Sequence, residues 1–79
     1  MDKKYEIILY GATGFTGQIC CKYIRDNYPD LLWAIGGRNK EKLQQIKSDF
    51  TLNCDVVVAD GADIVALKLM TSQTKVVLS

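Results

Sequence analysis

Residues 5–17 read YEIILYGATGFTG, an apolar run that ends in three glycines spaced three apart, Gly11, Gly14 and Gly17. This pattern predicts a strand that leads into a glycine-rich turn and then a helix. We expect Gly11 to permit the tight turn, Gly14 to let phosphates approach the backbone, and Gly17 to let the helix pack closely on the strand. The free N–H groups at the start of that helix would then bind a pyrophosphate. The alternative is a glycine-rich loop that binds no ligand.

The stretch LLWAIGGRNK, residues 31–40, lies where a dinucleotide-binding fold contacts the adenosine ribose. In such folds an acidic residue about twenty positions after the glycine loop binds the ribose 2′-hydroxyl. No such residue ends this strand; Gly36 and Gly37 leave space, and Arg38 and Lys40 supply positive charge. Because the planar donors of arginine suit a 2′-phosphate, the pattern favours NADP over NAD. The alternative is that Arg38 and Lys40 only begin a solvated helix.

Apolar segments alternate along the chain in a way that predicts the order β-α-β-α-β-α-β. Apolar, β-branched strands between helices indicate a parallel sheet that is covered on both faces. Right-handed crossovers then give the strand order 3-2-1-4 of a Rossmann-like α/β fold, truncated after the fourth strand. The expected strands span residues 5–10, 32–35, 55–59 and 75–78.

Three helices are expected between these strands. The first runs from about Gly14 to Asn27, Asn39 caps the second, and Asp63 caps the third. Apolar residues at helical spacing mark one face of each helix. These are Ile19, Cys20, Tyr23 and Ile24 in the first helix, Leu43, Ile46 and Phe50 in the second, and Ile64, Leu67, Leu69 and Met70 in the third.

Four segments together resemble the start of the saccharopine dehydrogenase-like oxidoreductases, a family that includes the bacterial trans-acting enoyl reductases. They are YEIILYGATGFTG, WAIGGRNKEKL, VVVADGAD and KVVLS, which cover nearly the whole chain. The resemblance implies that residues 1–79 form part of an N-terminal NADP-binding Rossmann domain, without the substrate domain. It also implies hydride transfer in the full-length relative, a link to lipid metabolism, and contact with membranes or lipid droplets.

The loops at the strand ends supply the candidate cofactor-binding residues. By resemblance, Asp60 accepts a hydrogen bond from the adenine amino group while Ala62 lines the ring; the alternative for Asp60 is a turn. Thr13 and Thr16 either reach a phosphate or cap the first helix, and Phe15 covers the cofactor, borders a substrate entrance or packs ordinarily. Trp33 is expected in the core. The full set is Gly11, Thr13, Gly14, Phe15, Thr16, Gly17, Gly37, Arg38, Asn39, Asp60, Ala62 and Ser79, the last near the nicotinamide ribose.

Composition limits the remaining classes of function. The 79 residues are 48% hydrophobic and 24% charged with a net charge of +1, which is typical of one small globular domain and suggests no nucleic-acid partner. Histidine is absent and the three cysteines lack metal-ligand spacing, so we predict no metal site and no Ser-His-Asp or Cys-His catalytic set. Reduced cysteines and the lack of a signal-peptide pattern favour an intracellular, cytoplasmic protein.

No catalytic residue is apparent, so two classes of function stay open. The first is the cofactor-binding part of an NADP-dependent oxidoreductase. The second is a non-catalytic NADP-binding module, as in NmrA-like regulators; an inactive truncated product is a further alternative. An apolar fourth strand without a following strand also predicts self-association through the open edge of the sheet.

Overall fold

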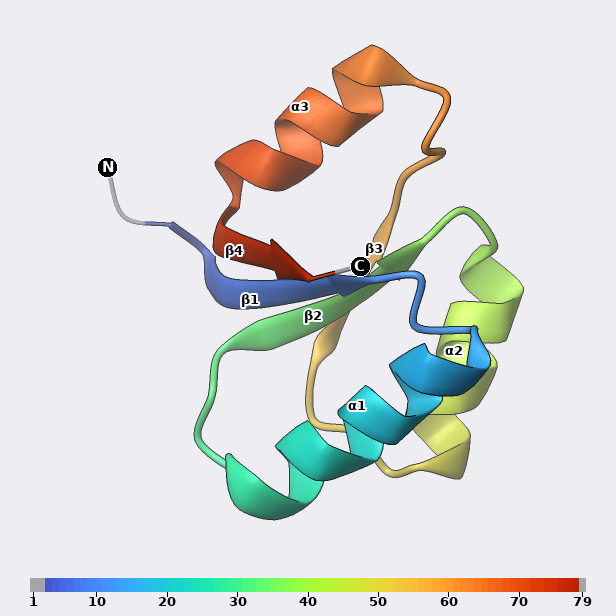
Figure 1. Cartoon of the computed structure of the whole chain (residues 1–79), viewed down its shortest axis with the longest axis vertical. Coiled ribbons are helices and arrows are strands. Elements are labelled where there is room, and N and C mark those ends of the chain that lie inside the picture. Colours follow the sequence, from blue (N-terminus) through green and yellow to red (C-terminus); the bar gives the residue numbers. More distant parts are fainter. Residues whose placement is uncertain (1–2, 79) are drawn as a thin grey trace.

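Four parallel strands form the centre of the computed structural model, which describes residues 3–78. The strands lie in the order β3-β2-β1-β4, and every neighbouring pair is parallel, so the predicted Rossmann-like topology is confirmed. Figure 1 shows the sheet nearly edge-on, with helices above and below it. In chain order the elements are β1 (Tyr5–Tyr10), α1 (Phe15–Asn27), β2 (Trp33–Gly37), α2 (Lys40–Asp49), β3 (Asp55–Val58), α3 (Ile64–Ser72) and β4 (Thr74–Leu78).

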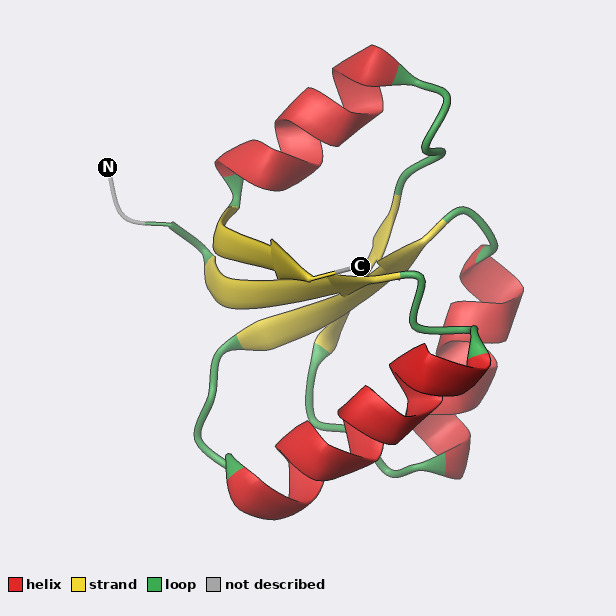
Figure 2. Ribbon diagram, viewed as in Figure 1, coloured by secondary structure: helices red, strands yellow, loops and turns green. Residues whose placement is uncertain are grey.

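The helices divide between the two faces of the sheet. Helices α1 and α2 cover one face and α3 covers the other, as Figure 2 shows. The chain steps in one direction from β1 to β3 and then returns across the sheet to β4. Because each crossover is right-handed, this reversal places α3 on the face opposite α1 and α2. The point of reversal lies between β1 and β4, where open α/β sheets bind ligands.

Two apolar cores hold the layers together. Trp33, only 4% exposed, belongs to the core under α1 and α2, as predicted. The core under α3 is smaller and contains Tyr5, Ile8, Ala34, Ala59 and Met70. The larger core contains Leu9, Ala12, Cys21, Ile24, Trp33, Ile35, Leu43, Ile46, Leu52 and Cys54.

The ends of three strands differ from the prediction. Strand β2 begins at Trp33 and continues to Gly37, whereas residues 32–35 were expected. It extends because Gly36 pairs with Tyr10 of β1 and Gly37 pairs with Val58 of β3. Strand β3 ends at Val58 rather than at residue 59, and β4 begins one residue early, at Thr74.

The predicted apolar face of α1 is wrong in part. Ile24 is buried, but Ile19 is 53% exposed and Tyr23 is 57% exposed. Cys21, three residues before Ile24, is fully buried and faces the core in their place. Ile19 and Tyr23 instead line a groove between α1 and the end of β4 that no other element of residues 3–78 covers.

The prediction for α3 is also wrong in part, whereas that for α2 is confirmed at its centre. Met70 of α3 is buried and Leu67 packs at the edge of the core, but Ile64 is 68% exposed and Leu69 is 61% exposed. One turn of α3 therefore carries most of its contact with the sheet. In α2, the residues Leu43 and Ile46 are buried, and Phe50, the C-cap residue that follows the helix, packs partly against the core.

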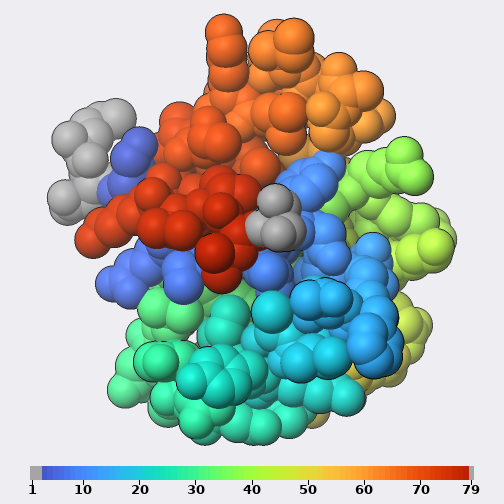
Figure 3. Space-filling model, in the orientation of Figure 1, coloured from blue at the N-terminus to red at the C-terminus, as the bar shows by residue number. Residues whose placement is uncertain are grey.

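Strand β4 lies at one edge of the sheet. It pairs with β1 on one side only, from Tyr5 with Thr74 to Leu9 with Leu78. Figure 3 shows this strand at the surface, in red, between α3 and α1. Val76 is 48% exposed and Leu78 is 41% exposed, so the edge is apolar as well as unpaired within the described residues.

Candidate cofactor-binding site

Three loops meet at the carboxyl edge of the sheet, because parallel strands all end on the same side. The glycine loop follows β1, residues 38–39 follow β2, and residues 59–63 follow β3. Backbone hydrogen bonds join them: the N–H of Gly11 donates to the carbonyl of Gly36 at 2.8 Å, and that of Ala59 donates to Gly37 at 2.9 Å. The loops therefore form one connected surface at the place where this fold class binds nucleotides.

The three glycines of the first loop serve different geometric needs. Gly11 has φ +81°, which favours glycine because other residues are strained there. A Cβ on Gly17 would lie 2.5 Å from the carbonyl oxygen of Gly11, so the first turn of α1 rests directly on the loop backbone. A Cβ on Gly14 would meet nothing closer than 3.5 Å, so its surroundings are open. This geometry matches the roles predicted for Gly11 and Gly17 and leaves room for a ligand at Gly14.

The start of α1 carries free backbone donors. Gly14 is the N-cap residue and offers no side chain, and no other side chain caps the helix. Within residues 3–78, the N–H groups of Phe15, Thr16 and Gly17 have no hydrogen-bond partner. Such donors, together with the positive end of the helix dipole, form a site for an anion.

The threonines of the loop do not cap the helix, so that alternative for Thr13 and Thr16 is wrong. Thr16 is exposed and Thr13 is half-buried. The side chain of Gln18 steadies the loop by donating from Nε2 to the carbonyl oxygen of Thr13 at 3.0 Å. Sequence reasoning missed Gln18, because a glutamine in the first turns of a helix carries no signal of its own.

A groove of about 740 Å³ runs along the glycine loop. Phe15 stands at its border and is 83% exposed, so the alternative of ordinary packing for this side chain is wrong. The groove extends to the end of β4, and Ser79, the last predicted site residue, lies outside the described residues. Its lining residues are Leu9, Tyr10, Gly11, Gly14, Phe15, Thr16, Gly17, Cys20 and Leu78.

The residues predicted to meet the ribose lie after β2. Arg38 is exposed and forms no hydrogen bond or ion pair with any residue from 3 to 78, so its guanidinium is available. Asn39 caps α2 as predicted, accepting from the N–H of Lys42 at 3.1 Å. Gly37 is buried, and a Cβ there would make only ordinary contact with Leu43, at 3.5 Å.

One acidic side chain lies close to this cationic region. Glu41, in the first turn of α2, lines the same shallow depression as Arg38, Asn39 and Lys40. Its negative charge would repel a 2′-phosphate, whereas the positive charges of Arg38 and Lys40 would attract one. The sequence pattern at the strand end did not reveal this neighbour, because Glu41 comes three residues after Arg38.

The loop after β3 is shaped by its two aspartates. Asp63 caps α3 as predicted, accepting from the N–H of Ala66 at 3.1 Å. Asp60 forms the turn that was the alternative reading, because its Oδ1 accepts from the N–H of Ala62 at 3.0 Å. Ala62 is exposed beside it. The predicted contacts of Asp60 and Ala62 with adenine stay predictions.

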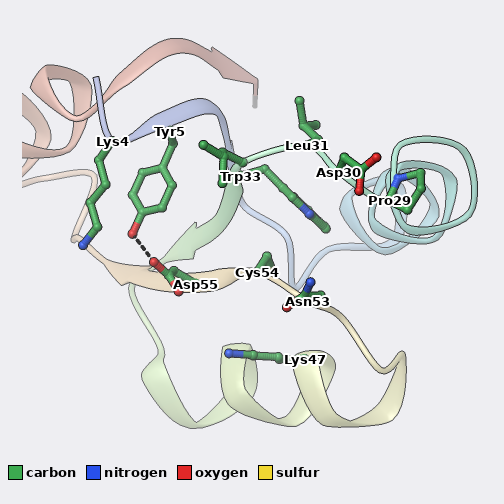
Figure 4. A pocket seen from close by; sticks show the side chains of 11 residues that line it. Lys4, Tyr5, Pro29, Asp30, Leu31, Trp33, Lys47, Asn53, Cys54 and Asp55 are labelled. Atoms are coloured by element: carbon green, nitrogen blue, oxygen red, sulfur yellow. Dashed lines mark hydrogen bonds between the residues drawn. The ribbon is translucent and has the colours of Figure 1, made fainter. Parts of the chain in front are cut away.

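A second pocket lies at the opposite end of the strands, far from the glycine loop along the sheet. Figure 4 shows Tyr5 donating its hydroxyl to Oδ2 of Asp55, at 2.6 Å, beside Trp33 and Lys47. Burial and this hydrogen bond raise the pKa of Tyr5 to about 12, so it stays protonated near neutral pH. Tyr5, Trp33 and Asp55 begin β1, β2 and β3, which places the pocket at the amino edge of the sheet.

The three cysteines are free thiols. Burial raises the pKa of Cys21 to about 12 and that of Cys54 to about 11, which leaves both thiols protonated and poorly nucleophilic. Neither side chain lines the groove at the glycine loop. Their contribution is to the larger core, where both pack.

Comparison with known proteins gives relatives that match nearly the whole chain. It is 32% identical over 85 residues to a lipid droplet localized protein of Caenorhabditis elegans, covering 96% of this chain and 20% of the relative. It is 27% identical over 81 residues to a trans-acting enoyl reductase of Mycobacterium tuberculosis (strain H37Rv), covering 99% of this chain and 19% of the relative. It is 28% identical over 93 residues to a saccharopine dehydrogenase-like oxidoreductase of Mus musculus, covering 99% and 22%. No family model matches the sequence.

The strand order and the three helices define a Rossmann-like α/β domain. Within that class, the predicted resemblance is confirmed: the chain is homologous to the N-terminal part of proteins named trans-acting enoyl reductase and saccharopine dehydrogenase-like oxidoreductase. The chain spans about a fifth of the length of these curated relatives. Among residues 3–78, none of the helices has the length and apolar character needed to cross a membrane.

Proposed function

We propose that residues 1–79 are an N-terminal NADP-binding unit of an oxidoreductase. The observation that carries this proposal is the set of unpaired N–H groups on Phe15, Thr16 and Gly17, next to the open backbone of Gly14. A pyrophosphate placed there would receive several hydrogen bonds and the favourable end of the α1 dipole. Two named groups of relatives are oxidoreductases, which supports a nicotinamide cofactor.

The surrounding loops suit the other parts of the cofactor. The free guanidinium of Arg38 would bind the 2′-phosphate, with Lys40 adding charge and Glu41 opposing it. Asp60 and Ala62 would meet the adenine, because they follow β3 at the same edge of the sheet. The nicotinamide would extend past Phe15 toward the end of β4. When bound, NADPH supplies the hydride, and the residues of this chain bind and orient it.

The substrate of such an oxidoreductase is proposed from the relatives alone. An enoyl reductase and a protein named for its location on lipid droplets support a role in lipid metabolism and contact with a lipid droplet or membrane surface. Because the groove by the glycine loop would hold the cofactor, the substrate would bind elsewhere than in that groove.

We also propose that the 79-residue chain self-associates through β4. The exposed side chains of Val76 and Leu78 accompany an unpaired strand edge in the described residues. A second copy could pair with this edge and bury both.

Calorimetric titration with NADPH tests the binding proposal. Gly14→Val would place a branched side chain in the open space at the phosphate site, and φ −76° with ψ 167° is a backbone conformation that valine adopts readily. We expect the parent chain to bind NADPH and the variant to lose binding while its circular dichroism spectrum stays close to that of the parent and its thermal transition stays cooperative. Equal binding by a folded Gly14→Val variant would show that the loop is structural only.

A further inference from the structure

Tyr10 joins two loops that the sheet itself keeps apart. It is the last residue of β1, and β2 lies between β1 and β3. The Tyr10 hydroxyl nevertheless donates to the carbonyl oxygen of Ala59, just past the end of β3, at 2.7 Å. The side chain therefore reaches across β2 to hold the chain where it leaves β3.

The space for this crossing is provided by glycines. Gly36 of β2 pairs with Tyr10, and a Cβ on Gly36 would lie 3.6 Å from Tyr10 Cδ1 and 3.2 Å from a methyl group of Ile8. A longer side chain at Gly36 would occupy the path of the ring. At the far end, a Cβ on Gly61 would lie 3.4 Å from the Tyr10 hydroxyl oxygen. The ring thus fills a passage that the two glycines leave open.

The loop after β3 depends on this contact, because Ala59 is the last residue before α3 that bonds to another element. Ala59 is 3% exposed, and its N–H donates to Gly37 while its carbonyl accepts from Tyr10. From Asp60 to Asp63, the hydrogen bonds of the described structure are local: Ala62 to the Asp60 side chain, and Asp63 to the Asp60 carbonyl. Between β3 and the start of α3, Ala59 is therefore the point at which hydrogen bonds hold the described loop to the sheet.

We infer that Tyr10 is a positioning residue that sets the loop of residues 59–62 for recognition of the adenine, an inference that rests on the proposed function. The same side chain lines the groove at the glycine loop, next to Gly11. The ring of Tyr10 thereby fixes the loop of residues 59–62 relative to the glycine loop. Specificity for the adenine base depends on this tether, whereas binding of the pyrophosphate depends on the N–H groups of α1.

Tyr10→Phe tests the tether, because it keeps the ring in the passage and removes only the hydroxyl. Tyr5→Phe is the matched control: it removes a tyrosine hydroxyl bond of similar length, 2.6 Å, from the same strand and the same core, at the opposite end of the sheet. The probes are NADP⁺ and its hypoxanthine analogue, which lacks the adenine amino group. Hydrogen–deuterium exchange of residues 60–63 reports the loop without any ligand.

We expect the parent and Tyr5→Phe to prefer NADP⁺ over the hypoxanthine analogue. Tyr10→Phe should bind NADP⁺ roughly three- to tenfold more weakly, the factor of one hydrogen bond, and lose most of that preference. Residues 60–63 should exchange faster in Tyr10→Phe alone. Unchanged exchange, an unchanged preference, or a parent without any preference would overturn the inference. A parent chain that binds neither dinucleotide would instead refute the proposed function.

Discussion

Gly17→Ala is the substitution for which helix propensity and packing predict opposite signs. In a helix, alanine is more favourable than glycine by up to about 1 kcal/mol. At Gly17, however, the added Cβ would lie 2.5 Å from the Gly11 carbonyl oxygen, 2.8 Å from Ala12 Cα and 3.0 Å from the Ala12 carbonyl carbon. Ordinary contacts are about 3.5 Å or longer, so α1 would have to move away from the loop by roughly 1 Å.

The size of the effect follows from what would have to move. Overpacking costs typically about 1–3 kcal/mol, and the upper end applies because all three neighbours are backbone atoms that no rotamer change can displace. After subtraction of the propensity gain, Gly17→Ala should lower the free energy of unfolding by about 2 kcal/mol. For a chain of this size, that corresponds to a fall in Tm of roughly 8–16 °C.

Urea and thermal denaturation followed by circular dichroism measure this loss. Gly14→Ala is the matched control, because Gly14 lies in the same loop and has an ordinary φ of −76°. A Cβ there would meet its nearest neighbour, the carbonyl oxygen of Gly11, at 3.5 Å. The free energy of unfolding of Gly14→Ala should fall by about 1 kcal/mol, less than for Gly17→Ala, because its cost is the preference for glycine over alanine at an N-cap and no backbone atom has to move. A Gly17→Ala chain as stable as the parent, or more stable, would refute the close packing of α1 on the loop.

Three further predictions concern the cofactor, a strained turn and the sheet edge. Arg38→Ala should weaken the binding of NADP⁺ by about ten- to a hundredfold in calorimetry and leave the binding of NAD⁺ nearly unchanged. Glu41→Gln should strengthen the binding of NADP⁺. Equal affinities of the parent for the two cofactors would contradict the NADP assignment. Thr51 has φ 53°, so Thr51→Gly should raise the free energy of unfolding by about 0.5–1 kcal/mol in urea, and a destabilised variant would contradict this. The sedimentation coefficient of the parent should rise with concentration, and Val76→Lys should suppress the rise by placing a charge on the β4 edge; a monomeric parent at high concentration would count against edge pairing.

Local patterns in the sequence were sufficient to predict the order of elements and the topology. The alternation of apolar strands and amphipathic helices gave β-α-β-α-β-α-β, and right-handed crossovers left one strand order, which the structure has. The caps at Asn39 and Asp63 were also predictable, because each depends on a side chain and a backbone N–H three residues away. Such features depend on short stretches of chain and on the chirality of the backbone.

Features set by distant contacts were not predictable in the same way. Helical spacing on α1 gives two overlapping apolar stripes, and only the docking of α1 decides that Cys21 faces the core while Tyr23 faces outward. The extension of β2 through Gly37 depends on its pairing with Val58 of β3. The contact of Tyr10 with Ala59 joins residues 49 apart, and it exists only because β2 offers a glycine beneath the ring.

The glycines around the site differ in what occupies the space that each leaves. Backbone atoms of the loop fill it at Gly17, and at Gly36 the neighbouring side chains of Ile8 and Tyr10 fill it, so substitution at either position disturbs the fold first. At Gly11 the space is open, but the positive φ restricts the residue type. Gly14 has both an open neighbourhood and an ordinary backbone conformation, so nothing within residues 3–78 requires a glycine there. Gly14 is therefore the position at which a substitution separates binding from folding, and a requirement for glycine there would have to come from a ligand.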